Sequence, residues 1–148
     1  MTIVPTPIVV MTSTETIVIT PTGVMTPTLS KQPDRATFAI YFKKISLAEL
    51  PIGAQAGPGS CPTYTSTFTG SRQMCVIFEV IKLPAQVTEA IYDTQRQEYV
   101  RLKAEVTPPI SGTGERIGCS PVTLPPGSYE YRAWVSDVLV AVLPFEVR

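Results

Sequence analysis

The last 25 residues constrain the fold of this chain more than any other stretch. They run from Leu124 to Arg148 and read LPPGSYEYRAWVSDVLVAVLPFEVR. Two arms rich in Val, Tyr and Phe flank Ser136-Asp137, and the first arm alternates apolar with polar side chains. A period of two that is interrupted by a two-residue turn is typical of a β-hairpin. We therefore predict a terminal hairpin that turns at Ser136-Asp137.

The first arm assigns its side chains to two faces of a sheet. The face expected to meet a core carries Tyr129, Tyr131, Ala133 and Val135, and the opposite face carries Ser128, Glu130, Arg132 and Trp134. The second arm does not keep this phase, because Phe145 and Val147 are its best core anchors. A one-residue bulge between Val140 and Phe145 would restore the phase, and Pro144, which cannot donate to a ladder, lies there.

From residue 35 onward, short apolar segments alternate with Pro, Gly and Ser turns, which predicts about seven β-strands. The predicted strands are 36–42, 74–83, 87–93, 98–107, 116–124 and the two hairpin arms. Residues 51–72 are expected to form a loop with one short edge strand. No stretch shows a helical period over a helical length, and residues 45–50 could form one helical turn at most. The predicted fold is an all-β, two-sheet antiparallel sandwich.

The predicted core draws on most of these strands. Segment 98–107 has the clearest alternation in the chain, with aliphatic residues at every second position and charged or aromatic residues between them. We expect one core that contains Phe78, Val80, Val100, Leu102, Ala104, Val106, Tyr129 and Phe145.

Residues 1–34 differ in composition from the domain predicted at 35–148. The first 30 residues hold nine Thr and four Pro but only one charged residue, Glu15. Thr/Pro-rich sequence is typical of an extended stalk, yet this one is too apolar for a solvated linker. It could be a strand added to its own sandwich or donated to a neighbouring molecule. The expected interface residues are Ile3, Val4, Ile8, Val10, Ile17, Val18 and Ile19.

Composition argues against several classes of function. The 12 basic and 12 acidic residues form no block of like sign, so the basic stripe that nucleic acids require is missing. No run approaches the ~18 apolar residues of a membrane span. The absence of His removes the usual general base and the commonest metal ligand. We therefore predict no catalytic, cofactor or metal site.

Three cysteines make an odd count, which in an exported protein indicates one disulfide and one thiol. Cys75 lies within an apolar strand, where a buried thiol packs as a small hydrophobe. Cys61 and Cys119 lie in loop-like contexts and form the preferred pair. Sequence alone leaves the other pairings open.

Two further groups of residues invite a functional interpretation. A glycosidase needs two carboxylates that face each other at roughly 5–10 Å, and the candidates are Glu79, Glu89, Asp93, Glu98 and Glu105. The alternation instead places Glu105 on an ordinary solvated face. Trp134, the only tryptophan, points away from the core, where it could stack on a sugar or anchor an interface. A neighbouring strand or an arginine stem could equally cover it.

The segment LPPGSYEY, residues 124–131, resembles the corner between the fifth and sixth strands of immunoglobulin-like domains. The following YRAWVSDVLVAVLPFEV resembles the last hairpin of immunoglobulin-like modules in bacterial extracellular and cell-envelope proteins. The resemblance covers residues 35–148 and is closest over the last 25. It implies that Tyr129 is a corner tyrosine whose hydroxyl bonds to nearby backbone. It also places Tyr131 where antibody domains have the second cysteine of their inter-sheet disulfide, so that bridge is absent.

The resemblance and the composition together suggest a non-catalytic structural or adhesive subunit outside the cell or at its surface. Its expected partners are further copies of itself or other envelope proteins, and a glycan is a further candidate. Donation of the N-terminal strand to a neighbour would build a filament, because such a head-to-tail contact does not close. The alternative is a carbohydrate-binding or spacer module cut from a larger secreted protein.

Overall fold

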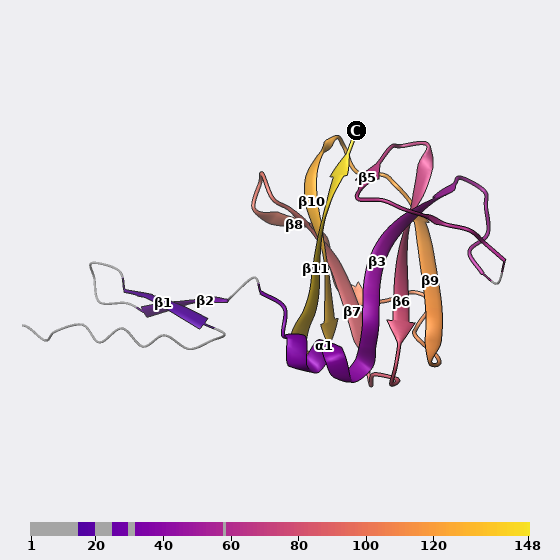
Figure 1. Cartoon of the computed structure of the whole chain (residues 1–148). Coiled ribbons are helices and arrows are strands. Elements are labelled where there is room, and N and C mark those ends of the chain that lie inside the picture. Colours follow the sequence, from indigo (N-terminus) through magenta and orange to yellow (C-terminus); the bar gives the residue numbers. More distant parts are fainter. Residues whose placement is uncertain (1–14, 20–24, 30–31, 58) are drawn as a thin grey trace, which may run out of the picture. The chain divides into compact units, whose positions relative to one another are not determined.

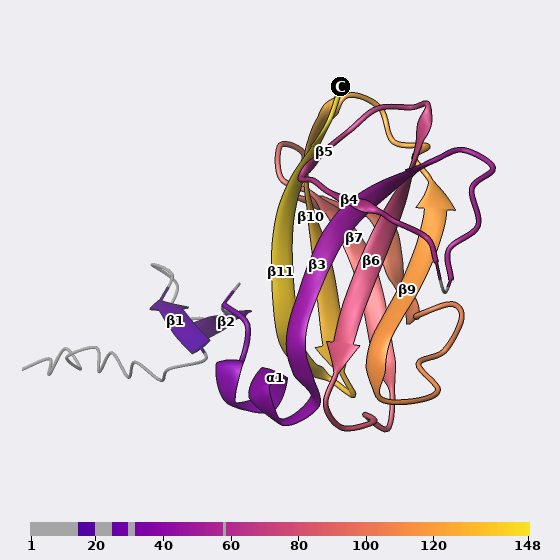
Figure 2. The same cartoon turned by 45° about the vertical axis from the view of Figure 1, so that its right-hand side comes forward.

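The computed structural model describes residues 15–19, 25–29, 32–57 and 59–148. The chain divides into two compact units, Met1–Gln32 and Pro33–Arg148. The second unit consists of two β-sheets packed face to face (Figures 1 and 2). The prediction of an all-β sandwich is therefore confirmed.

The first unit contains a two-stranded antiparallel sheet. Strand β1 (Glu15–Ile19) pairs with β2 (Met25–Leu29), and Ile17 lies opposite Pro27. The Thr, Ile and Val residues of β1 favour extended backbone, because their branched side chains restrict χ1. Ile17, Val18 and Ile19 thus lie in a strand that pairs within its own unit. The other predicted interface residues of this segment, Ile3, Val4, Ile8 and Val10, lie outside the described residues.

One sheet of the sandwich has five strands in the order β5-β11-β10-β7-β8. Their bounds are Thr67–Phe68 (β5), Val87–Asp93 (β7), Glu98–Glu105 (β8), Gly127–Val135 (β10) and Val138–Val147 (β11). All neighbours pair antiparallel except β5, which runs parallel to the end of β11. Strands β8, β10 and β11 lie close to the positions predicted for segment 98–107 and the two hairpin arms.

The other sheet has four strands in the order β4-β3-β6-β9, all antiparallel. Their bounds are Phe42–Pro51 (β3), Thr63–Tyr64 (β4), Arg72–Val80 (β6) and Gly114–Pro121 (β9). Figure 2 shows β3, β6 and β9 side by side in one layer, with β11, β10 and β7 in the layer behind. The predicted loop at 51–72 holds two short strands, β4 and β5, instead of one.

The prediction was wrong at the start of the sandwich, where helix α1 (Arg35–Tyr41) replaces the expected strand at 36–42. Asp34 caps this helix, because its Oδ1 accepts hydrogen bonds from the backbone N–H groups of Ala36 (2.9 Å) and Thr37 (3.1 Å). The cap satisfies amides that a strand would have paired with a neighbour. Strand β3 then includes residues 45–50, for which a helical turn was the alternative.

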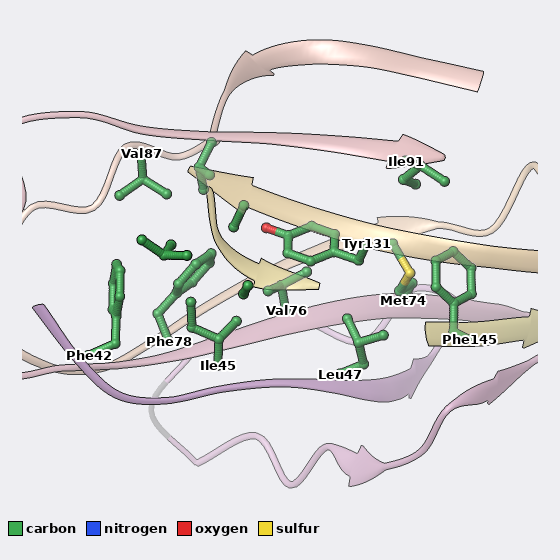
Figure 3. Close-up of a cluster of buried hydrophobic side chains, with 14 of the residues drawn as sticks. Phe42, Ile45, Leu47, Met74, Val76, Phe78, Val87, Ile91, Tyr131 and Phe145 are labelled. Atoms are coloured by element: carbon green, nitrogen blue, oxygen red, sulfur yellow. The ribbon is translucent and has the colours of Figure 1, made fainter. Parts of the chain in front are cut away.

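The core lies between the sheets and confirms the predicted inner positions of β6 and β10 (Figure 3). Phe42 and Phe78 pack together near one end, with 5.8 Å between ring centroids. Met74 and Phe145 lie near the other end, beside Ile91 (Figure 3). Predicted core residues that are buried are Phe78, Val80, Val106, Tyr129 and Phe145.

Strand β8 departs from the predicted core. Val100, Leu102 and Ala104 are exposed, and Leu102 is exposed to 76%. The pairing of β7 with β8 has two irregularities, which give β8 two extra residues between Glu98 and Glu105. The first puts Arg101 in place of Val100 opposite the buried Ile91, and the second puts Ala104 opposite Glu89 on this edge strand. The regular alternation of apolar and polar residues in the sequence of β8 therefore does not place its apolar side chains on one buried face.

The terminal hairpin forms as predicted. Val135 pairs with Val138 across Ser136-Asp137, and Ser136 adopts a positive φ of 54°. The expected bulge is present, but at Val140, where the register shifts between Ala141 and Leu139. Pro144 instead pairs with Glu130 in the regular ladder, so the prediction that Pro144 marks the bulge was wrong.

The corner before β10 is fixed by Tyr129. Its hydroxyl donates a hydrogen bond of 2.8 Å to the carbonyl oxygen of Pro125, and its ring stacks on Phe145. A Cβ at residue 127 would lie 3.2 Å from this hydroxyl, so Gly127 leaves the space that the ring needs. The hydrogen bond expected of Tyr129 is thus present.

We expect Tyr129→Phe to lower the free energy of unfolding by roughly 1–2 kcal/mol, because the Pro125 carbonyl loses its partner while the ring stays packed. Urea unfolding followed by circular dichroism measures the change. Tyr64→Phe is the matched control, because Tyr64 is exposed, and its effect should stay within about 0.5 kcal/mol. Equal effects of the two changes would contradict a structural role for the Tyr129 hydroxyl.

Candidate functional site

The outer face of the five-stranded sheet carries an unusual group of aromatic and charged side chains. We call it the aromatic face and define it as Tyr92, Tyr99, Glu130, Arg132, Trp134 and Lys103. Strand alternation places Glu130, Arg132 and Trp134 on the side of β10 that points away from the core, as the sequence predicted. Tyr92 of β7 lies directly opposite Tyr99 of β8.

Arg132 is the centre of the aromatic face. Its Nε and Nη2 donate to Oε2 of Glu130 at 3.0 and 2.7 Å, and its Nη1 donates to the Tyr99 hydroxyl at 2.8 Å. Its guanidinium carbon lies 3.9 Å from the centroid of the Tyr92 ring. The two tyrosine rings meet edge to face at 5.1 Å. Arginine suits this position because its planar group can stack and form several hydrogen bonds at once.

These contacts hold Arg132 in one place. Its side chain is only 8% exposed, although it points away from the core. Burial lowers the pKa of Arg132, but hydrogen bonds to Glu130 and Tyr99 outweigh this effect and raise it above the ordinary value. The guanidinium therefore stays charged and fixes both Glu130 and Tyr99.

Trp134 lies further along β10, beside the turn of the terminal hairpin. The ammonium group of Lys103 sits 5.1 Å from its ring centroid and forms an ion pair of 3.0 Å with Asp137. Trp134 is half-buried. The structure therefore confirms its outward orientation and covers part of the ring with a lysine from β8.

A hollow of about 470 Å³ adjoins the aromatic face at Glu130. Polar side chains line much of it, including Thr67, Ser128, Glu130, Glu146 and Arg148. Arg148 pairs with Glu146 at 3.2 Å, so both carboxylates that border the hollow have an arginine partner. The hollow thus presents hydrogen-bonding groups with little net charge.

Of the candidate carboxylates, the structure brings Asp93 and Glu98 together, opposite each other on β7 and β8. Glu79 pairs with Lys43 at 3.8 Å. Asp93 accepts backbone hydrogen bonds at the β7–β8 turn, where Arg96 lies 3.8 Å from Asp93 and 3.9 Å from Glu98. Glu105 is exposed on β8. Asp93 and Glu98 thus share Arg96 at the turn, and Glu79 has a lysine partner.

Glu89 has a different environment, because it faces inward between the sheets. The hydroxyl of Tyr131 donates to Glu89 Oε2 at 2.7 Å, and Arg101 Nη1 lies 4.0 Å from Glu89 Oε1. Burial, followed by the negative charge of Glu89, raises the pKa of Tyr131 well above its ordinary value. The Tyr131 hydroxyl stays protonated and donates to Glu89. This hydrogen bond links β10 to β7 inside the sandwich and has a structural role.

The predicted disulfide was wrong. Cys75 bonds to Cys119, whereas Cys61 is an exposed free thiol. Cys75 and Cys119 lie directly opposite each other on β6 and β9, with 4.1 Å between their Cα atoms. Cys75 was expected to be a buried thiol because its strand is apolar, but it points to the outer side of its sheet. There it is buried with Ala48, Leu50 and Ile77.

The sequence pointed to Trp134 and, more weakly, to Tyr99 as outward aromatic rings, but the cluster that Tyr92, Tyr99 and Arg132 form was not predicted. A usable signal was the segment YDTQRQEY, residues 92–99, in which two tyrosines flank a short turn symmetrically. Such symmetry places the two rings on one face of a hairpin. The contacts of Arg132 with both rings depend on how β10, β7 and β8 pack together, and no local sequence pattern predicts them.

Within the part of the chain that the structure describes, no helix is long and apolar enough to cross a membrane. In the same residues, no group of three or more Cys, Asp or Glu side chains is arranged to hold a metal ion. Comparison with known families found no family model that matches the chain, and comparison with curated proteins found no similar sequence.

Proposed function

We propose that this chain is a non-catalytic structural or adhesive subunit that assembles by adding its N-terminal β-strands to a neighbouring subunit. The observation that carries the proposal is the two-stranded sheet of β1 and β2, which belongs to a different compact unit from the sandwich. A two-stranded hairpin is marginally stable in water unless further strands or a packing surface support it. Addition to another sheet would supply that support.

Among the described residues, β1 pairs on one side only, with β2, and its other edge is the better donor. Glu15–Ile19 contains no proline, whereas β2 has Pro27 at its centre and lacks one donor there. Because Ile17, Val18 and Ile19 already pair with β2, the donated element is a hairpin and not the single strand that the sequence suggested. Main-chain hydrogen bonds along β1 would give affinity, and alternate side chains would give specificity.

The proposed acceptor is the outer edge of β8. Among the described residues, β8 pairs on one side only, with β7. It exposes Tyr99 to 41% and Leu102 to 76%, together with Val100. An exposed edge strand with apolar side chains is the kind of edge that pairs with another chain.

Strand β9 is the other long edge strand. The connection after β8 lies against its inner face, because the Thr107 carbonyl oxygen is 3.5 Å from the position of a Cβ at Gly118, which pairs with the core residue Val76. Pro108 and Ile110 of the same connection share a cavity of about 120 Å³ with Ile117 and Gly118. The exposed apolar side chains of β8 favour it over β9 as the acceptor.

We also propose that the sandwich is immunoglobulin-like and that the protein works outside the cell or at its surface. The hydrogen bond from Tyr129 to Pro125 supports the first point, as does the parallel pairing of β5 with the final strand β11. The Cys75–Cys119 disulfide supports the second, because such bonds persist in oxidising compartments.

Removal of residues 1–32 tests the assembly. The remaining unit, Pro33–Arg148, contains both sheets and the whole hydrophobic core, so we expect it to fold alone. Sedimentation velocity should show concentration-dependent chains for the full protein and a single monomer for the truncated one. If the full protein is already monomeric and the truncation lowers its Tm, the N-terminal unit belongs to its own sandwich and the proposal is wrong.

A further inference from the structure

We propose that the aromatic face and the adjoining hollow form a binding site for a neutral oligosaccharide. This inference concerns a different surface from the proposed assembly, because strand addition uses backbone groups along the β8 edge, and Tyr99 is the residue that the two surfaces share. The site uses side chains that point away from the sheet. It would add a ligand-binding activity to the structural role.

The first support is the combination of apolar rings with hydrogen-bonding groups. One side of a sugar ring is lined with C–H groups that pack on aromatic rings, while its hydroxyls seek polar partners. Tyr99 is 41% exposed and offers the ring. Ser128, Thr67 and the two carboxylates of the hollow offer donors and acceptors. Binding sites commonly combine apolar surface with a few placed polar groups in this way.

The second support is charge. Glu130 is neutralised by Arg132, Glu146 by Arg148, and Asp137 by Lys103. Each carboxylate keeps lone pairs for a hydroxyl without leaving a net charge to attract an ion. The surface therefore suits a neutral saccharide better than an acidic one or a cation.

The third support is rigidity. Arg132 is held by Glu130 and by both tyrosine rings, so Tyr99 and Glu130 do not need to be ordered when a ligand binds. A prearranged site loses less conformational freedom on binding. Burial of an outward-pointing arginine that is only 8% exposed costs desolvation free energy, which a purely covering role on the sheet would not require.

The extent of the site indicates a chain of sugars instead of one. Glu130 lies opposite Tyr92, and Trp134 lies four positions further along β10. Four residues of strand span about 13 Å, and Tyr99 is two strands away from β10, about 10 Å. An oligosaccharide that packs on Tyr99 could extend toward the half-buried Trp134 ring.

The test is binding of the full-length protein to an immobilised panel of neutral cello-, xylo-, manno- and chito-oligosaccharides, with uronic acid oligomers as the charged set. We expect binding within the neutral set and a loss of at least about tenfold in affinity for Tyr99→Ala, as expected when one stacked ring is removed. Titration calorimetry with the best-bound oligosaccharide measures the change.

Tyr64→Ala is the matched control. Tyr64 is also an exposed strand tyrosine with a lysine over its ring, at 4.6 Å, but it belongs to the four-stranded sheet. Its affinity should equal that of the unchanged protein. Circular dichroism of both variants checks that they fold. The proposal is overturned by a failure to bind any neutral member, by preference for the uronic acids, or by equal losses in the two variants.

Discussion

Replacement of both Cys75 and Cys119 by alanine is expected to lower the free energy of unfolding by about 4 kcal/mol. The bond closes a loop with a sequence separation of 44, and its loss restores that freedom to the unfolded chain. Cys75 is also fully buried, so alanine leaves a small void beside Leu50 and Ile77. Thermal unfolding should show a fall in Tm of roughly 10–20 °C.

Cys61→Ala serves as the control for this change. Cys61 is an exposed free thiol, so its replacement should alter stability by less than about 0.5 kcal/mol. In the native protein, a thiol reagent should modify Cys61 alone. Modification of all three cysteines in unfolded, unreduced protein would contradict the disulfide, and so would a Cys61→Ala effect as large as that of the double replacement.

Alkaline pH is expected to destabilise the fold through Tyr131. Its pKa in the folded protein is raised well above 10.0, because the hydroxyl is buried beside Glu89. The folded state therefore holds this proton more tightly than the unfolded state. The resulting stability is complete below about pH 10 and is lost as pH rises through the folded pKa. The free energy of unfolding should fall by up to about 1.4 kcal/mol per pH unit for this residue.

Tyr131→Phe isolates that contribution. At pH 7 the variant loses the hydrogen bond to Glu89, which should lower stability by roughly 1–2 kcal/mol, while Arg101 remains near the carboxylate. Above about pH 10 its stability should fall less steeply than that of the unchanged protein. Urea titrations across the alkaline range measure both slopes. Identical slopes would show that Tyr131 is not the group responsible.

The sequence predicted the fold best where each strand has a regular partner on both sides. Strands β6 and β10 lie inside their sheets, so alternating residues such as Val76 and Tyr131 kept the facing that their spacing predicts. At the edge, β8 could accept two extra residues in its pairing with β7. Its alternation was the clearest in the chain, yet Leu102 faces solvent.

The remaining errors came from interactions between distant residues. The Asp34 cap was readable from sequence, but the strand propensity of residues 36–42 concealed it. The Cys75–Cys119 bond depends on the register of β6 against β9, and no local pattern fixes that register. Trp134 was identified as an outward ring, whereas the cluster around Arg132 assembles from three strands and became visible only in the fold.

Head-to-tail assembly through β1 and β8 is the central claim. Mixing two altered subunits tests it most directly, when one lacks the donor strand and the other has a blocked acceptor edge; we call these the blocked subunits. The 33–148 protein keeps the β8 edge but has no donor. Full-length protein with Leu102→Lys keeps the donor, while a lysine on the exposed edge should hinder pairing. Ile52→Lys, which changes an exposed isoleucine in a loop, controls for the added charge.

Sedimentation equilibrium should show each blocked subunit alone as a monomer, and their mixture as a one-to-one dimer that does not grow with concentration. The Ile52→Lys protein should form chains like the unchanged protein. A mixture that still contains only monomers would contradict assembly through these two edges. Chains formed by the Leu102→Lys protein alone would also contradict it.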